Sequence, residues 1–413
     1  MFDWAESAFT TTIMAAILPV YYASVSASSL PENMRTVYWA YTSAIGLGIS
    51  ALISPAFGVL LDLSPNKKRI LFSSTVVACI ATACLAMTGP GDYILTSVIY
   101  LIAFLAFAFG HVAYNGLLMQ LASGDDADML SSAGFALGYL GGGILFLVNI
   151  IMIAKWEAIG FASKLSATHW CFISVAIWVV IFTLPLMLWV KEKPLPPGSV
   201  AAKFDLRTIW EVYRQLYDTF REIQKFRDLF IFLCAYWLYS DGIGTIFRMA
   251  TAFGSEVGVD DSSMMLALLA VQFVGFPATF AFGFLAKKIG AKNSLIVTLV
   301  TYSAITILGY FMKTTKDFWM LALLVGLVQG GSQALSRSLF TRLVPKDKAN
   351  EFFGFYLLSE RFAGVLGPLL FGVVSQLSGA SRNSILFLIA FFVIGIFLLQ
   401  KVDFIRGQRV AQK

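Results

Sequence analysis

The chain has 413 residues, of which 58% are hydrophobic and 13% are charged, and its mean hydropathy is +0.77. A water-soluble domain cannot expose that much apolar surface, so the composition predicts an all-α polytopic membrane protein. The formal charge of +6 could suggest a nucleic-acid partner. The cationic residues instead gather in short loops between apolar segments, where they would face anionic lipid headgroups. We therefore expect membrane lipid, and no nucleic acid, as a partner.

Twelve apolar segments of about 20 residues each predict twelve membrane-spanning helices. In the first half they lie near residues 5–25, 36–61, 70–88, 93–121, 129–153 and 168–190. In the second half they lie near residues 229–253, 262–286, 293–312, 317–341, 350–377 and 383–401. The predicted fold class is therefore twelve transmembrane helices arranged as two six-helix bundles.

Basic loops alternate with nearly uncharged ones along the chain. The basic ones are Lys67–Arg69, Lys191–Arg227, Lys287–Lys292 and Arg342–Lys348. By the positive-inside rule these loops face the cytoplasm, and an even number of spans then places both termini there. The first apolar segment follows acidic residues rather than a basic region, so we interpret it as a retained helix and not as a signal peptide.

A long polar connection divides the chain into residues 1–190, a linker at 191–227, and residues 228–413. Within the linker, apolar residues recur every three or four positions from Leu206 to Ile223, which predicts an amphipathic helix on the inner membrane surface. The halves resemble each other weakly at a separation of about 222 residues, since Pro55 and Gly58 correspond to Pro277 and Gly283. This repeat predicts two pseudo-symmetric bundles.

A polar stripe interrupts the tenth predicted span. Gln329, Gln333 and Arg337 are four residues apart, and Ser332 and Ser336 are expected on nearly the same helix face. Because an Arg inside a membrane is costly, the stripe indicates a substrate or ion path. Arg337 could bind a substrate carboxylate or phosphate, or it could hold an inner gate to an acid.

Other polar residues recur at equivalent positions of the repeat. The same offset aligns His111 with Gln333, Asn115 with Arg337, and Tyr139 with Arg361, as a central pseudo-symmetric site would require. The predicted cavity residues are Gln329, Gln333, Arg337, Asn115, Tyr139, Tyr236 and Tyr239.

Three residues are predicted to take part in ion coupling. Asp241 lies near the middle of the seventh span and is a candidate proton or cation site. The alternative is a static pair with an Arg from another helix. Glu360 is a second candidate, although it cannot face its neighbour Arg361 because adjacent helical residues point about 100° apart. His111 titrates in a suitable pH range, but a histidine here could also serve packing alone.

Gating is expected at the cytoplasmic ends of the helices. Asp3 and Glu6 open the first span, where acids also favour a helix N-terminus. Asp62 ends the second span beside a basic turn that includes Lys67 and Arg69, and this turn is expected to hold one state shut. Arg361, about ten residues into the eleventh span, is also a predicted gating residue. Either Glu360 or Arg361 is expected to pair with Asp62, Asp241 or Arg337.

Glycines concentrate in the fifth span at Gly138, Gly141, Gly142 and Gly143. A phosphate loop is not supported, because no Lys-Ser or Lys-Thr pair follows the run. Close helix packing or bending is the favoured interpretation.

The six-plus-six pattern and the turn with Gly58, Asp62 and Lys67–Arg69 resemble the major facilitator superfamily. The segments Phe2–Phe9 (FDWAESAF), Ser131–Gly143 (SSAGFALGYLGGG) and Gly330–Ser338 (GGSQALSRS) are similar to the vacuole-effluxer family, whose fungal members export amino acids from the vacuole. Its members usually carry Asn where this chain has Glu6. The short loops resemble a bacterial relative, which implies the inner (plasma) membrane.

These features predict a monomeric secondary transporter that works by alternating access. Its expected substrate is a small solute such as a neutral amino acid, moved by export and coupled to protons. No cofactor, no metal and no enzymatic activity are expected, since the chain has no nucleotide-binding motif and no spaced Ser/His/Asp set. The alternatives are an exporter of amphiphilic or lipid-like molecules, and a receptor or assembly subunit that does not transport.

Overall fold

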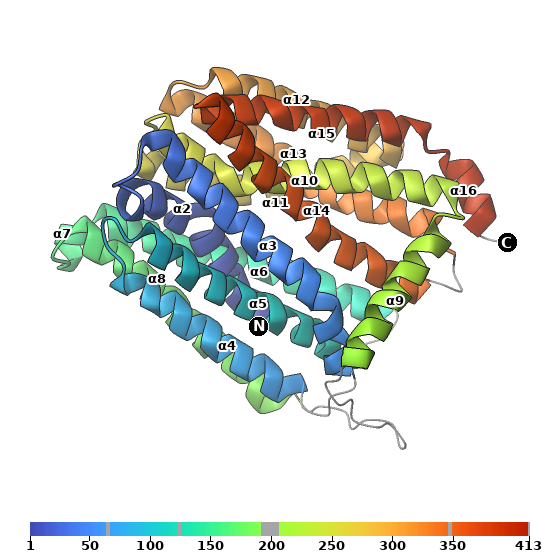
Figure 1. Cartoon of the computed structure of the whole chain (residues 1–413), viewed down its shortest axis with the longest axis horizontal. Coiled ribbons are helices and arrows are strands. Elements are labelled where there is room, and N and C mark those ends of the chain that lie inside the picture. Colours follow the sequence, from blue (N-terminus) through green and yellow to red (C-terminus); the bar gives the residue numbers. More distant parts are fainter. Residues whose placement is uncertain (63–66, 122–124, 191–205, 346–348, 412–413) are drawn as a thin grey trace. The chain divides into compact units, whose positions relative to one another are not determined.

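The computed structural model describes residues 1–62, 67–121, 125–190, 206–345 and 349–411 (Figure 1). Within these ranges the side chains of residues 58–60, 62, 115–116, 118–121, 125–136, 139, 206–209, 276, 349–351, 353–354, 357–358 and 360–361 lie outside the description. The described residues form helices joined by short turns, with no strand among them. The chain divides into two compact units.

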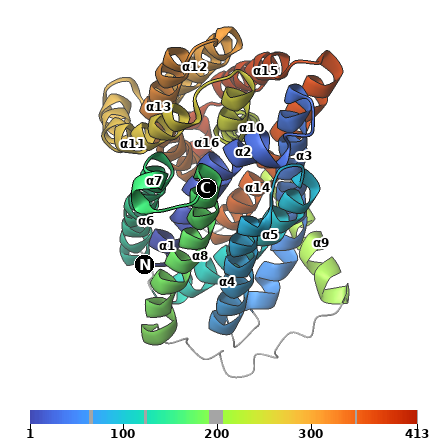
Figure 2. The same cartoon turned by 90° about the vertical axis from the view of Figure 1, so that its left-hand side faces the viewer.

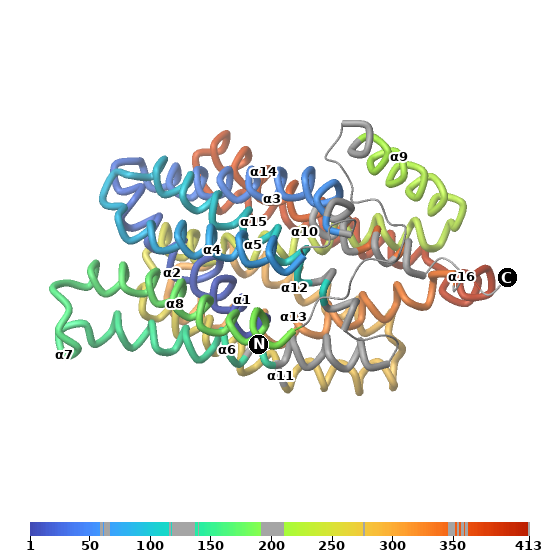
Figure 3. Tube along the Cα trace, turned by 90° about the horizontal axis from the view of Figure 1, so that it is seen from below, coloured from blue at the N-terminus to red at the C-terminus, as the bar shows by residue number. Residues whose placement is uncertain are grey.

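Unit 1 comprises residues Met1–Pro31 and Ile49–Tyr213. Its first membrane helix changes between α-helical and π-helical hydrogen bonding, in the order α1 (Phe2–Ala8), η1 (Phe9–Ala16), α2 (Ile17–Tyr21) and η2 (Tyr22–Ser26). The remaining helical segments of unit 1 are the later part of α3 (Glu32–Asp62), then α4 (Lys67–Cys84), η3 (Leu85–Met87), α5 (Tyr93–Leu121), α6 (Asp125–Ala154), α7 (Trp156–Ile159) and α8 (Lys164–Trp189). The helices α4, α5 and α8 lie side by side (Figure 2), and the short α7 joins α6 to α8 at one end (Figure 3).

Unit 2 comprises residues Glu32–Gly48 and Arg214–Lys413. Its helices are α10 (Arg227–Glu256), α11 (Asp261–Ile289), α12 (Ala291–Phe311), α13 (Thr315–Leu343), α14 (Ala349–Ser378), α15 (Ser381–Lys401) and α16 (Phe404–Ala411). Within it, α13 packs between α11 and α12, whereas α10 packs on α14 and α15.

Helical segments lie along each of the twelve predicted spans, so the all-helical fold class is confirmed. Over the described residues, nine helices are long and apolar enough to cross a membrane, or ten if the bent pair Asp261–Gly275 and Pro277–Ile289 forms one span. Two more apolar stretches, Leu140–Ala154 and Phe362–Ser378, are shorter.

The early part of α3 packs within unit 2, although it precedes most of unit 1 in the sequence. The Trp39 indole N–H donates to the carbonyl oxygen of Arg248 on α10 at 3.2 Å. The Tyr41 hydroxyl donates to Oε1 of Gln376 on α14 at 2.5 Å. One continuous helix of 31 residues therefore contributes to both units.

The linker contains the predicted helix, α9 (Leu206–Ile223). Trp210 and Tyr217 are exposed on it, whereas Val212, Thr219 and Ile223 are buried. Its placement on the membrane surface stays a prediction.

Candidate functional site

Asp241 is the most deeply buried carboxylate of the candidate site, with 2% of its surface exposed. It lies in α10, a helix of 30 residues. Its Oδ2 accepts a hydrogen bond from the backbone N–H of Gly367 on α14 at 2.7 Å. Its Oδ1 is also buried and has no hydrogen-bond partner among the described residues. A carboxyl group with one free oxygen in such an environment can accept a proton.

Gly367 is required at this position by the space that its neighbours occupy. A Cβ atom there would overlap the hydroxyl of Thr245 and lie 2.6 Å from Oδ1 of Asp241. Thr245 itself donates to the carbonyl oxygen of Asp241 at 2.8 Å, one helical turn back. Pro368 follows within α14, and glycine beside proline is where a helix can bring backbone groups close to a neighbour.

Arg248 lies two turns beyond Asp241 on the same helix and acts on it electrostatically. A Cβ at Gly244 would lie 2.6 Å from Nη1 of Arg248, so the guanidinium turns back along α10 toward Asp241. A Cβ at Gly364 of α14 would lie 3.7 Å from Nη2. Among the described residues, the cation that acts on Asp241 lies on its own helix. The alternative of a static pair with an Arg from another helix is not tested by these residues.

The predicted polar stripe on α13 separates into two faces. Ser332 and Ser336 are buried, and the Ser336 hydroxyl donates to the carbonyl oxygen of Ser332 at 2.6 Å. Gln333 and Arg337 are exposed. The expectation that the serines share the face of Arg337 was wrong, because successive helical residues are rotated by about 100°. Gln329 is half-buried.

The two predicted cavity tyrosines on α10 lie in the interior of unit 2. The Tyr239 hydroxyl is 2.7 Å from Oγ of Ser336. The Tyr236 ring stacks on Tyr356 of α14 with centroids 4.6 Å apart. Both side chains are buried between helices, so their role in substrate binding stays a prediction.

A second titratable pair lies in unit 1, between α1 and α5. Nδ1 of His111 is 2.7 Å from Oε2 of Glu6, with side-chain exposures of 35% and 18%. One turn away, the Tyr114 hydroxyl donates a short hydrogen bond to Asp3. Sequence reasoning gave His111 a coupling role and Glu6 a gating role; the structure brings the two together.

Glycines allow α6 to approach α1 closely. A Cβ at Gly138 would lie 2.6 Å from Oγ of Ser7, and one at Gly141 would lie 2.5 Å from the Trp4 ring. A Cβ at Gly142 would lie 2.9 Å from the Ser7 carbonyl oxygen. The predicted close helix packing is confirmed for these three glycines.

Two of the remaining predicted residues have described side chains. Lys67 is buried and Arg69 is exposed at the start of α4. The side chains of Asp62, Asn115, Tyr139, Glu360 and Arg361 lie outside the described residues. Among those that are described, no group of three or more His, Cys, Asp or Glu could hold a metal ion.

Sequence reasoning missed Gly367, which contributes a backbone N–H rather than a side chain. The adjacent Gly367 and Pro368 inside an apolar span could have indicated a close helix contact at this position. It also missed Glu256 at the other end of α10, whose Oε2 accepts from the Ser381 hydroxyl at 2.6 Å. No local spacing connects residues 125 positions apart in the sequence.

Comparison with known proteins places the chain in a family. The family described as "Vacuole effluxer Atg22 like" matches residues 31–412. The chain is 36% identical over 402 residues to the uncharacterized MFS-type transporter YxiO of Bacillus subtilis (strain 168), covering 97% of this chain and 92% of that one. It is 25% identical over 300 residues to autophagy-related protein 22-1 of Aspergillus niger, covering 68% of this chain and 48% of the fungal protein.

Among solved structures, a D-xylose-proton symporter superposes with a TM-score of 0.70 at 15% identity, covering 98% of this chain and 97% of that one. At this identity the likeness concerns the fold alone. Together with the apolar helices, these findings identify an integral membrane protein. The chain belongs to the Atg22-like vacuole effluxer family, and it is a membrane transporter of the major facilitator type.

Proposed function

We propose that the protein is a proton-coupled secondary transporter that exports a small zwitterionic solute, such as a neutral amino acid, by alternating access. Asp241 carries this proposal, because its buried carboxyl group has one bonded oxygen and one without a partner among the described residues. Charging and neutralising such a group changes its burial cost greatly, which is how a proton can drive a conformational cycle.

Arg337 is the proposed partner of the substrate carboxylate. It is exposed together with Gln333 on α13, six residues before this helix ends at Leu343. A guanidinium facing hydrocarbon would be costly, so we infer that this face of α13 borders a water-filled path. Arginine can bind a carboxylate through two parallel hydrogen bonds.

The Glu6–His111 pair is proposed as a second proton-binding centre, in unit 1. Both groups are partly exposed and within hydrogen-bond distance of each other. Since imidazole titrates near neutral pH, the pair can exchange a proton with water during the cycle.

We place the protein in a bacterial inner membrane as a monomer, with both termini in the cytoplasm. The distribution of Lys and Arg supports this orientation, and the 36% identical relative is from Bacillus subtilis. Export is supported by the family description, which names an effluxer.

The test is uptake of labelled neutral amino acids into proteoliposomes, with and without an imposed proton gradient. We expect saturable, gradient-driven uptake that Asp241→Asn abolishes. Asp260→Asn is the matched control, because Asp260 is exposed and caps α11, and Asn caps a helix about as well as Asp. No uptake by the intact protein, or equal activity of the two variants, would reject proton coupling of amino-acid transport at Asp241.

The Arg337→Ala variant separates binding from coupling. If Arg337 binds the substrate carboxylate, this change raises KM by about tenfold or more, while exchange of protons by the protein continues. Arg337→Lys should recover only part of the affinity, because an ammonium cannot make the paired hydrogen bonds. Inhibition by amphiphiles but not by amino acids would favour the amphiphile exporter instead.

A further inference from the structure

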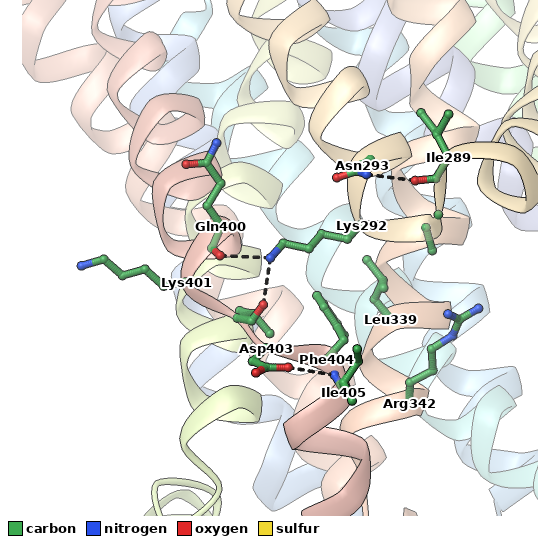
Figure 4. Close-up of a pocket in the computed structure, with 13 residues that line it drawn as sticks. Ile289, Lys292, Asn293, Leu339, Arg342, Gln400, Lys401, Asp403, Phe404 and Ile405 are labelled. Carbon is green, nitrogen blue, oxygen red and sulfur yellow. Dashed lines mark hydrogen bonds between the residues drawn. The ribbon is translucent and has the colours of Figure 1, made fainter.

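A pocket of about 540 Å³ lies in unit 2 where several membrane helices reach their ends (Figure 4). It is lined by the end of α11, the first turn of α12, the last turns of α13 and α15, and the start of α16. The basic turn Lys287–Lys292 borders it, which by the positive-inside pattern sets it at the cytoplasmic surface.

Two cations with remaining hydrogen-bond capacity line this pocket. Lys292 donates from Nζ to the carbonyl oxygens of Gln400 at 3.0 Å and Val402 at 2.8 Å. An ammonium has three donors, so one is not used by these two bonds. The same Nζ lies 5.9 Å from the centroid of the Phe404 ring. Arg342, in the last turn of α13, is exposed and has no hydrogen bond or ion pair with any described residue. With respect to the described residues, its five N–H donors are therefore available to a ligand.

The other charged side chains of the pocket are already engaged. The Asp403 carboxylate accepts hydrogen bonds from the backbone N–H groups of Ile405 and Arg406, both at 3.0 Å. Lys401 is directed away from the other labelled side chains (Figure 4), with Nζ 4.2 Å from the centroid of the Phe397 ring. Both hydrogen bonds to Asp403 reach its Oδ1, and the carboxylates of Asp403 and Asp228 also act electrostatically on Lys292. Among the described residues, the positive charge that remains for a ligand is therefore mainly that of Arg342.

The same pocket has an apolar wall formed by Ile289, Leu339, Phe404 and Ile405. Ile405 is 67% exposed. A small soluble anion gains nothing from such a wall, whereas the glycerol and upper acyl carbons of a lipid would bury against it. Positive charge beside exposed apolar side chains at the membrane surface matches an anionic amphiphile.

We propose that this pocket binds the headgroup phosphate of an anionic phospholipid from the cytoplasmic leaflet. Arg342 makes paired hydrogen bonds to the phosphate oxygens, and the remaining Lys292 donor adds a third. The lipid carbons pack on Ile289 and Ile405. This site does not include the residues proposed for coupling and substrate binding. The lipid-binding proposal can therefore fail while the transport proposal holds, and the reverse.

The test uses the full chain in an uncharged detergent and measures retention of phosphatidylglycerol against phosphatidylcholine by native mass spectrometry. We expect selective retention of phosphatidylglycerol, weakened about tenfold by Arg342→Gln. The matched control is Arg409→Gln, which removes the same charge from α16 outside the pocket. Equal weakening by both variants would indicate general attraction to a basic surface and would overturn the site.

A second comparison distinguishes lipid from free phosphate. Ile405→Ser should weaken phosphatidylglycerol retention several-fold, because it removes apolar contact without changing charge. Millimolar inorganic phosphate should not protect the protein from heat in an Arg342-dependent way. If it does, and Ile405→Ser has no effect on lipid retention, the pocket binds free phosphate and the proposal fails. Unchanged unfolding temperatures of the variants exclude misfolding as the cause.

Discussion

The backbone N–H of Gly367 points at the carboxylate of Asp241 and donates to it at 2.7 Å. This hydrogen bond joins α14 to α10 through a main-chain group, so it cannot be removed by changing a side chain at residue 367. The donor can, however, be displaced by adding a side chain at residue 367. Glycine substitutions therefore test the geometry around Asp241 without altering any charge.

Gly367→Ala is expected to reduce transport strongly and to destabilise the protein by about 1–3 kcal/mol. The added methyl group would overlap Thr245 and crowd Asp241, so the carboxylate must move away from its donor. Gradient-driven uptake and the unfolding midpoint in detergent measure the two effects. Gly364→Ala is the control on the same helix, because its Cβ would meet neighbours at an ordinary 3.7 Å. Equal behaviour of the two variants would contradict the close fit.

A second glycine comparison concerns the contact of α6 with α1. Gly141→Ala is expected to destabilise the protein by about 1–3 kcal/mol, because its Cβ would enter the Trp4 ring. Gly143→Ala should be neutral or slightly stabilising, since nothing lies within 4 Å of its Cβ and alanine favours helix. Thermal unfolding of the two purified variants measures the difference. If Gly143→Ala lowered the unfolding midpoint as much as Gly141→Ala, the difference in space around the two glycines would not explain their effects on stability.

The Glu6–His111 pair can be tested by a double-mutant cycle. We expect Glu6→Gln and His111→Gln each to lower uptake, and the double variant to be no worse than the poorer single one, because both remove the same interaction. A coupling of about 1 kcal/mol in stability is reasonable for a partly exposed pair. Glu157→Gln, an exposed acid outside α1, should have no effect. Strictly additive losses would mean that the two residues act separately.

The C-terminal helix is expected to detach when Arg406 is replaced. Arg406 donates from Nε and Nη2 to the buried Asp228 at 2.7 and 2.6 Å, and this carboxylate raises the pKa of the guanidinium above its usual value. Arg406→Gln leaves Asp228 without that partner, which is costly for a buried charge. We expect a lower unfolding midpoint and faster tryptic cleavage after Arg409, the tryptic site that remains in α16.

Arg409→Gln is the comparison for that experiment. It lies on the same short helix and is exposed, with no hydrogen bond or ion pair to any described residue. Its removal should change neither the midpoint nor cleavage elsewhere in the helix. Release of α16 by both variants would show that overall charge, rather than the Asp228 contact, holds it in place.

The helices themselves were predictable from local sequence. Apolar runs of membrane length located the long helices, the three-to-four spacing from Leu206 located α9, and the glycines of the fifth span indicated close packing. Each of these signals depends on residues within a few turns of one another, because hydrophobic burial and backbone hydrogen bonding in a helix are local. The segments Phe2–Phe9 and Gly330–Ser338, which resemble the family, could likewise be identified from the sequence alone.

The sequence by itself determined that this protein consists of membrane helices. It also placed Asp241, Arg337, Glu6 and His111 within predicted spans, where a polar side chain is energetically unfavourable. Only the tertiary structure decided their surroundings: Asp241 against Gly367, Glu6 against His111, and Arg337 turned away from Ser336. It also decided that α3 contributes to both units. These outcomes depend on which helices pack together and at what rotation, and that choice is set by side chains far apart in the chain, to which no local spacing refers.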